Sequence, residues 1–396
     1  LQVTDTLADG DHSYDVIATD IAGNTDTATG SVEIDTSTTV TATLFSGSDS
    51  GISDADGITQ ETTPTFVGTG EVGAAIVLTI DGDTYNGTVG ADGNWRINVD
   101  SALADGVYPY QVTATDVAGN ESSVNGSVEV DTEAPLFNGG LSDSSDSGTS
   151  STDNITNETQ PSFSGTGEVG AAVVLSIAGQ TYSGVVDAGG NWNIVASSAL
   201  SAGDYPYTLT ATDTAGNSTT LSDTIEVDTS TTLTGALSTV SDSGLSSSDE
   251  ITLDNTPQFN GTGEAGAAVV LTIAGETYTA TVGNDGNWTL QVDDVLSDAT
   301  HAYLITSTDI AGNQATVNGS ITVDTSTEVT ASLALSSDTG VSNVDGITNV
   351  QTPTFSGTAE AGAGIVVEIN NQTYNGTANA SGEWSIQVTG SLGDGS

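Results

Sequence analysis

Short apolar runs, each ended by turn residues, recur along the whole chain. In residues 36–131, the segment Val40–Leu44 alternates apolar and polar side chains, and Ala75–Ile80 is almost wholly apolar. Alternation with a period of two indicates a half-buried strand, and a short apolar run between turns indicates a buried one. Asp81-Gly82 follows the second run and predicts a tight hairpin turn. The strands predicted in this segment are 40–44, 65–68, 75–80, 84–89, 95–99, 108–115 and 123–130.

These short strands, with turns between them and no helical period, are typical of an immunoglobulin-like β-sandwich of about seven strands. We therefore expect an all-β chain whose core is built from the inward-facing residues of these strands. The predicted core residues of this segment are Phe66, Ile76, Leu78, Ile80, Tyr85, Trp95, Ile97, Leu103, Tyr110 and Val112.

The same pattern returns with a fixed period. A junction aspartate at the start of a D-T pair occurs at 35, 131, 228 and 324, so the intervals are 96, 97 and 96 residues. The only four tryptophans, Trp95, Trp192, Trp288 and Trp384, keep the same spacing. A period of this length predicts a tandem array in which each repeat is one small domain. The expected boundaries are the end of a repeat at 1–35, whole repeats at 36–131, 132–228 and 229–324, and the beginning of a repeat at 325–396.

The charge balance limits the partners. The chain has 53 acidic residues, a single basic side chain in Arg96, and a formal net charge of −52. Such a surface repels nucleic acid and anionic membranes, so we expect neither as a partner. Clustered carboxylates without basic partners favour a hard divalent cation, and calcium suits flexible loops better than magnesium. The chain has no cysteine, and no apolar run reaches the ~20 residues that span a bilayer.

Acidic residues recur where consecutive repeats should meet. Because successive strands run in opposite directions, the G-T-G-E turn (Gly68–Glu71) and the D-x-A-G-N loop (Asp116–Asn120) should lie where the chain enters a repeat, beside the junction aspartate. Two or three carboxylates with backbone carbonyls form the oxygen shell that calcium prefers. Alternatively, these residues only satisfy turn amides or end a strand. The predicted junction ligands are Asp20, Asp35, Glu71, Asp116, Asp131, Glu168, Asp213, Asp228, Glu264, Asp309, Asp324 and Glu360.

A second set of aspartates lies in the acidic loop, residues 46–59 of the first whole repeat. Two aspartates seven residues apart recur in each copy, while the residues between them differ. The spacing is not that of an EF-hand, so either a loop-bound calcium or Asx-turn scaffolding would explain it. The pairs are Asp49 and Asp56, Asp146 and Asp153, Asp242 and Asp249, and Asp338 and Asp345.

No repeated reactive group points to catalysis. His12 and His301 occur in two of the repeats only, and the chain contains no G-x-S-x-G, P-loop or H-E-x-x-H motif. Paired carboxylates alone would be a weak argument for glycoside hydrolysis. The tryptophans lie on predicted strands, which favours the core over a sugar-stacking platform. We therefore expect that the chain is not an enzyme.

Four motifs together resemble a known family: V-D-T at the junctions, D-S-G…D-x-I-T in the acidic loop, T-P-x-F-x-G-T-G-E-x-G-A, and Y-x-x-x-A-T-D-x-A-G-N. The combination is similar to the bacterial Ig-like repeats of very large adhesins of the RTX class, which type I systems secrete and which include biofilm and ice-binding adhesins. The resemblance implies an extracellular extender on a bacterial cell surface, which carries a ligand-binding tip. It also implies calcium at the junctions between neighbouring repeats, held by Asp35 with Glu71 and Asp116, Asp131 with Glu168 and Asp213, and Asp228 with Glu264 and Asp309.

Two other functions remain open from the sequence. Each repeat could bind carbohydrate or another surface weakly, and the array would then supply avidity. The chain could also be a subunit of a surface layer or appendage. Exposed tryptophans would favour the first alternative, and self-assembly in calcium the second.

Overall fold

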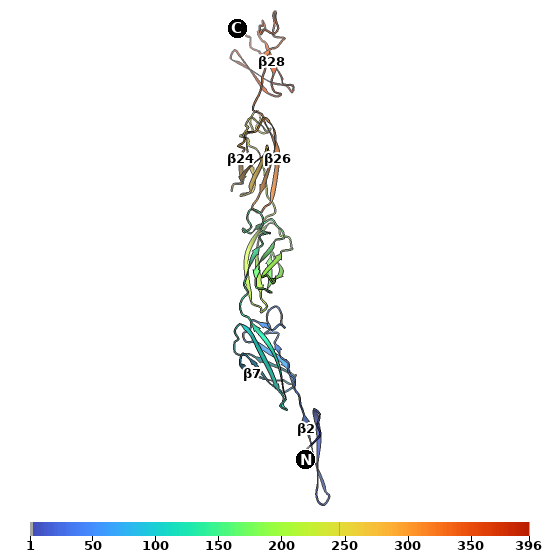
Figure 1. The fold of residues 1–396 in the computed structure, drawn as a ribbon. Helices are drawn as coiled ribbons and strands as arrows, with labels where there is room; N and C mark the ends of the chain where they lie inside the picture. The colour runs from blue at the N-terminus through green and yellow to red at the C-terminus, as the bar shows by residue number, and fades with distance from the viewer. Residues whose placement is uncertain (1–2, 245, 396) are drawn as a thin grey trace. The chain divides into compact units, whose positions relative to one another are not determined.

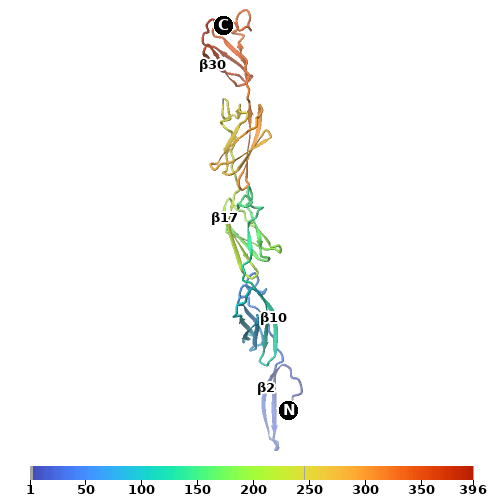
Figure 2. The same cartoon turned by 60° about the vertical axis from the view of Figure 1, so that its left-hand side comes forward.

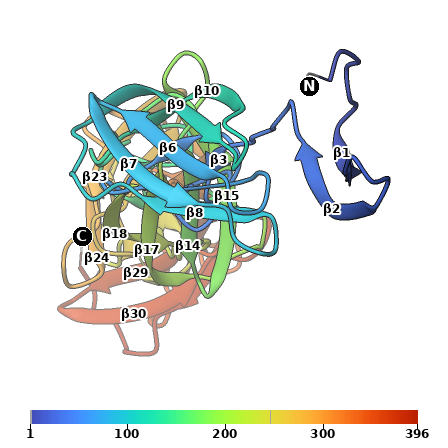
Figure 3. The ribbon, with the colours of Figure 1, turned by 90° about the horizontal axis from the view of Figure 1, so that it is seen from below.

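The computed structural model describes residues 3–244 and 246–395, and over these residues the chain is all-β, without helices (Figure 1). The first whole repeat, 36–131, is a sandwich of two sheets. Its three-stranded sheet has the order β3 (Thr43–Leu44), β5 (Thr65–Thr69), β8 (Asn94–Asn98). Its five-stranded sheet has the order β4 (Ile58–Thr59), β10 (Glu121–Val130), β9 (Gly106–Thr115), β6 (Ala75–Ile80), β7 (Asp83–Thr88), the last three side by side in Figure 3.

The next two repeats have the same two sheets; β17 of the second is labelled in Figure 2. In 132–228, the three-stranded sheet has the order β11 (Phe137–Leu141), β13 (Ser162–Gly167), β16 (Asn191–Val195). The five-stranded sheet has the order β12 (Ile155–Thr156), β18 (Ser218–Val227), β17 (Gly203–Thr212), β14 (Ala172–Ile177), β15 (Gln180–Val185). In 229–324, the three-stranded sheet has the order β19 (Ala236–Leu237), β21 (Gln258–Thr262), β24 (Asn287–Gln291). The five-stranded sheet has the order β20 (Ile251–Thr252), β26 (Gln314–Val323), β25 (Ala299–Thr308), β22 (Ala268–Ile273), β23 (Glu276–Thr281).

The two partial repeats hold the strands that their place in the period predicts. Residues 1–35 contain the hairpin β1 (Gly10–Thr19) and β2 (Thr25–Ile34), which corresponds to the last two strands of a whole repeat. Residues 325–396 contain β27 (Ser332–Leu333), β28 (Thr354–Thr358) and β31 (Glu383–Gln387) in one sheet and β29 (Gly364–Ile369) with β30 (Gln372–Thr377) in another.

The core of each repeat lies between its sheets. Phe66, Ile76 and Leu78 are fully buried, as are their counterparts in the later whole repeats. The four tryptophans are 3–4% exposed, and the indole of Trp95 donates a hydrogen bond to the Thr41 carbonyl (3.2 Å). This confirms that the tryptophans belong to the core. Of the predicted core residues, only Tyr85 and Tyr110 are half-buried, and both pack on the edge of the cluster.

The strand predictions agree with the structure except in two places. Asp81 (φ 50°) and Gly82 (φ 83°) form the predicted tight turn between β6 and β7. The predicted strand 40–44 is shorter, because Val40 makes only an isolated bridge to Gly70 and regular pairing begins at Thr43. The acidic loop ends in a short strand that was not predicted, β4, which pairs in parallel with β10.

The chain divides into two compact units: residues 1–230 with 310–313, and residues 231–309 with 314–396. The first unit contains the strands β1–β18, and the second contains β19–β31. Among the described residues, no helix is long and apolar enough to cross a membrane.

Candidate metal centres

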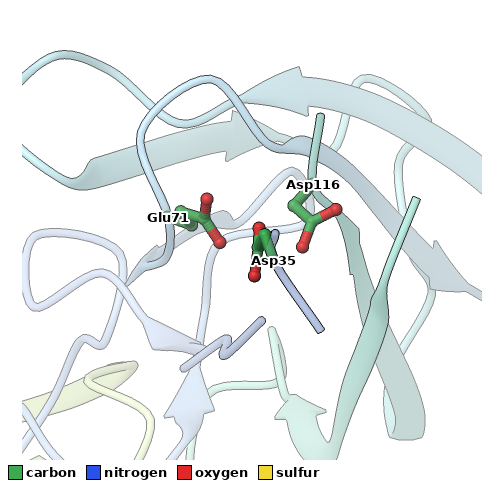
Figure 4. A group of neighbouring side chains, drawn as sticks. All are labelled: Asp35, Glu71 and Asp116. Carbon is green, nitrogen blue, oxygen red and sulfur yellow. The ribbon is translucent and has the colours of Figure 1, made fainter. Parts of the chain in front are cut away.

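The first junction brings three carboxylates from two repeats together. Asp35 follows β2, Glu71 lies in the turn between β5 and β6, and Asp116 follows β9 directly. One carboxylate oxygen from each lies within 4.8 Å of the others, and Figure 4 shows the three side chains directed toward a common space. Asp116 is buried, Asp35 is half-buried and Glu71 is exposed. The meeting of these residues, predicted from strand direction, is found at this junction.

The D-x-A-G-N loop positions its aspartate by hydrogen bonds. The amides of Gly119 and Asn120 donate to Asp116 Oδ1 (2.7 and 2.8 Å), and the Asn120 side-chain amide donates to Oδ2 (2.8 Å). Burial raises the pKa of Asp116, but the hydrogen bonds from Asn120 and the loop amides outweigh it and hold the pKa below its ordinary value of 3.8. Asp116 therefore stays ionised, with lone pairs left to bind a cation.

The same loop also holds the junction chain. The side-chain amide of Asn120 donates to the Asp35 carbonyl (3.1 Å), and that of Asn217 donates to the Asp131 carbonyl (2.9 Å). From the sequence, this asparagine is expected only to satisfy amides of its own turn. Its recurrence at the fifth position of every D-x-A-G-N loop was the available indication of a further contact.

At the second junction, burial and the charges of neighbouring carboxylates raise the pKa of Glu168. Asp213 is fully buried, and its loop has the geometry of the Asp116 loop, with Oδ1 accepting from the amides of Gly216 (2.7 Å) and Asn217 (2.9 Å). Burial raises the pKa of Glu168 above its ordinary value of 4.5, and the negative charges of Asp213 and Asp131 raise it further. Like charges held together in this way make a cation favourable.

The remaining predicted junction residues are placed less completely. Asp228 belongs to the first unit of the chain, and Glu264 and Asp309 to the second, so this third set stays a prediction. Asp324 and Glu360 both line a cavity of about 300 Å³. Asp20 is exposed and binds the backbone and side chain of Asn24 within its own loop, without other acidic site residues grouped around it among the described residues.

The acidic loops share one unusual feature. The first aspartate of each pair accepts a backbone hydrogen bond on Oδ2, as Asp49 does from Gly57 (3.3 Å), and the second caps a turn, as Asp56 does for Ile58 (3.1 Å). Oδ1 of the first aspartate is buried in all four loops, without a hydrogen-bond partner in the part of the chain that the structure describes. The aspartates concerned, Asp49, Asp146, Asp242 and Asp338, are 5–6% exposed.

An unpartnered buried carboxylate oxygen is costly, so these loops have an unmet requirement for a donor or a cation. Burial raises the pKa of Asp49 and of Asp146 above 3.8, and the neighbouring Asp56 and Asp153 carboxylates add to each shift. Asx-turn scaffolding accounts for Oδ2 and for the second aspartate of each pair, but it leaves Oδ1 unexplained.

Both kinds of site fit calcium better than a softer metal. The groups offered are carboxylate oxygens and loop carbonyls, and no thiol exists in the chain. Calcium takes 6–8 oxygen ligands at ~2.3–2.6 Å and tolerates irregular geometry. The turn-capping role of the aspartates, which the sequence left as an alternative, is also present, and it orients the oxygens that a cation would use.

The histidines have a structural role. His12 and His301 each bind the carbonyl four residues earlier through Nε2 (2.7 and 2.8 Å). Tyr108 occupies the equivalent position in its repeat, and its hydroxyl donates to the carbonyl four residues earlier (2.9 Å). Because a tyrosine makes the same contact, the position serves the loop before a strand rather than acid–base chemistry.

Together, the fold and these junctions define a tandem array of immunoglobulin-like domains. The family model of the bacterial Ig-like domain matches residues 37–132, 134–229, 230–325 and 326–396, so the chain belongs to this family. No curated protein matches the chain.

Two solved structures illustrate the relationship. A Ca²⁺-stabilized adhesin that helps an Antarctic bacterium reach out and bind ice is 30% identical over 88% of this chain and 90% of its own, with a TM-score of 0.31. A tetra-tandem repeat from the extending region of a large adhesion protein is 24% identical over 88% of this chain and 90% of its own, with a TM-score of 0.29.

Proposed function

We propose that this chain is a spacer segment of the extender region of a large bacterial cell-surface adhesin, in which calcium at the junctions stiffens the array. The observation that carries the proposal is the meeting of Asp35, Glu71 and Asp116, from two consecutive repeats, within 4.8 Å. The relative at 30% identity is described as a Ca²⁺-stabilized adhesin, which supports both calcium and the adhesin role.

The junction residues would act by tying two repeats to one ion. The junction aspartate comes from the end of one repeat, and the glutamate and the loop aspartate come from the start of the next. A cation held by all three would resist bending, because bending moves the ligands apart. Without it, the same carboxylates repel one another, as the raised pKa of Glu168 indicates for the second junction.

The acidic loop is proposed as a second calcium site within each repeat. Its support is the unpartnered, buried Oδ1 of Asp49 and of the three equivalent aspartates. A calcium ion there would give this oxygen a ligand and offset the repulsion from Asp56. The site would stabilise the single repeat, whereas the junction site would stiffen the connection between two repeats.

Among the residues that the structure describes, the repeated tryptophan and histidine positions have structural roles. The tryptophans that would form a stacking platform are buried in the core, and the histidine position is occupied by tyrosine in another repeat. The proposed function is therefore mechanical: the segment would lie outside the cell and hold another part of the protein away from the surface.

Calcium titration of the whole chain tests this function. Isothermal titration calorimetry should show calcium binding that Glu71→Gln weakens at one site. Asp83→Asn, at an exposed residue of β7 that belongs to none of the predicted calcium sites, removes the same charge and is the matched control. Equal binding by both variants and the parent chain would contradict the junction site.

A further inference from the structure

The acidic loop of one repeat contacts the D-x-A-G-N loop of the next repeat directly. Ser50 Oγ donates a hydrogen bond to the Ala215 carbonyl (2.5 Å), and the Ile52 amide approaches the Thr214 carbonyl (3.4 Å). Both partners are backbone carbonyls, so the contact involves no charged group. It also involves none of the proposed calcium ligands.

The contact recurs one period later in the same geometry. Ser147 Oγ donates to the Ala311 carbonyl (2.7 Å), and the Thr149 amide donates to the Ile310 carbonyl (3.1 Å). All of these residues lie within the first unit of the chain. Two independent copies of one arrangement indicate that it belongs to the repeat rather than to one local sequence.

A glycine makes the close approach possible. Gly51 has a φ of 97°, and a Cβ at this position would lie 2.0 Å from the Thr214 carbonyl oxygen. Gly148 has a φ of 96°, and its Cβ would lie 1.8 Å from the Ile310 oxygen. Gly244 has the same backbone conformation (φ 107°), but nothing lies within 4 Å of its Cβ position. A side chain at Gly51 or Gly148 would therefore clash with the next repeat, whereas one at Gly244 would not.

The alanine of the D-x-A-G-N loop is buried where an acidic loop contacts it and exposed where none does. Ala215 and Ala311, which face an acidic loop, are 0% and 1% exposed. Ala118 is exposed, and its neighbour Val117 is 87% exposed. Residues 1–35 contain no acidic loop that could cover them. The burial of this alanine therefore reports docking.

We propose that the Ser-Gly pair of each acidic loop, here called the Ser-Gly socket, is a docking site for the D-x-A-G-N loop of the following repeat. The sockets are Ser50-Gly51, Ser147-Gly148 and Ser243-Gly244, with Thr339-Gly340 at the same place in the last repeat. The socket is a second, cation-independent connection at each junction, so it goes beyond the proposed calcium function.

The third socket shows what an open docking site contains. Ser243 and Gly244 line the cavity of about 300 Å³ together with Leu253, Asp324 and Glu360. The occupant that fits this cavity is the D-x-A-G-N loop of another repeat of the same kind, because such loops fill the two earlier sockets.

The test uses the full chain with spin labels on Glu129→Cys and Ser222→Cys, two exposed positions in consecutive repeats. The chain has no native cysteine, so labelling is specific. Gly51→Ala should broaden the distance distribution between the labels. Gly57→Ala is the matched control, because Gly57 also has a positive φ (77°) in the same loop, but its Cβ would face only Ser127 of its own repeat (3.4 Å).

A second pair of variants separates docking from loop stability. Ser50 and Ser243 each accept a hydrogen bond from a backbone amide of their own repeat, Gln60 (2.9 Å) and Leu253 (2.8 Å). Of these two serines, Ser50 alone also binds the next repeat in the part of the chain that the structure describes. Ser50→Ala should therefore broaden the label distances, and should lower the melting temperature more than Ser243→Ala does.

The outcomes also distinguish the socket from the calcium proposal. If the socket is correct, Gly51→Ala and Ser50→Ala broaden the distribution both in calcium and in chelator. If both variants match Gly57→Ala, the socket is wrong. If chelator broadens the distribution of the parent chain while both variants match Gly57→Ala, the junction metal alone connects the repeats and the socket is wrong.

Discussion

Glu168 offers a test in which calcium should reverse the sign of one substitution. Burial raises the pKa of Glu168, and the negative charges of Asp213 and Asp131 raise it further. In chelator, Glu168→Gln removes a charge that its neighbours repel, so the variant should be more stable than the parent. In calcium, the same change removes a ligand, so the variant should be less stable.

The magnitudes follow from the exposure of the side chain and from linkage. Glu168 is exposed, so solvent screens its two like-charge contacts, and each should cost only about 0.2–1 kcal/mol. A bound ion at a free concentration 100 times its Kd contributes about 2.7 kcal/mol, and a hundred-fold weaker site would contribute about 0.4 kcal/mol. Losing the ion thus costs about 2.3 kcal/mol. Because the substitution also relieves about 0.4–2 kcal/mol of repulsion, the net loss in calcium is about 0.3–1.9 kcal/mol. For a domain of this size, 1 kcal/mol shifts the Tm by roughly 4–8 °C.

Differential scanning calorimetry of the full chain, with calcium and with excess chelator, measures both effects. Asp204→Asn removes an exposed charge from β17 of the same repeat, at a residue outside the predicted calcium sites, and should change little in either condition. The reasoning is refuted if Glu168→Gln lowers the melting temperature in chelator as well, or if it leaves the melting temperature in calcium unchanged.

Three further predictions follow from the same groups. In chelator, the melting temperature should rise as the pH falls toward the ordinary pKa values of these carboxyl groups, 3.8 for Asp49 and Asp146 and 4.5 for Glu168. The pKa values of Asp49, Asp146 and Glu168 are raised in the folded state, so protonation of these groups stabilises the fold, and this stabilisation is lost as the pH rises through the raised values. The pKa of Asp116 is lowered, so the stability that its ionised form contributes is lost only as the pH falls below 3.8. Asp146→Asn should remove one calcium ion per chain, counted by equilibrium dialysis, and should stabilise the chelated chain, because it removes a buried charge. Trp192→Ala should cost about 3–5 kcal/mol by calorimetry, equally with and without calcium, because it opens a cavity in the core.

The sequence predicted most of the fold because the strands are encoded locally. The predicted strand Ala75–Ile80 is β6 with the same limits, since a short apolar run between turn residues is typical of a buried strand. Asp81-Gly82 adopts the positive φ values that a tight hairpin requires. The junction carboxylates could be expected to meet because alternating strand directions fix which loops share an end.

What the sequence could not predict depends on partners distant along the chain. β4 is two residues long, lies in a loop rich in glycine and aspartate, and pairs with β10 far along the chain. The Ser50 contact joins residues 165 positions apart, and Ser50-Gly51 alone resembles any turn. The unpartnered oxygen of Asp49 is also invisible from spacing, because it depends on how the loop is buried.

Small-angle X-ray scattering of the full chain measures whether calcium at the junctions stiffens the array. The measurement compares calcium with excess chelator at about 0.15 M salt, where charges more than ~8 Å apart are largely screened. Chelation should reduce the radius of gyration and the maximum dimension, because junctions without calcium bend. An unchanged scattering curve, with calcium binding confirmed in the same sample, would contradict the proposal that calcium stiffens the array.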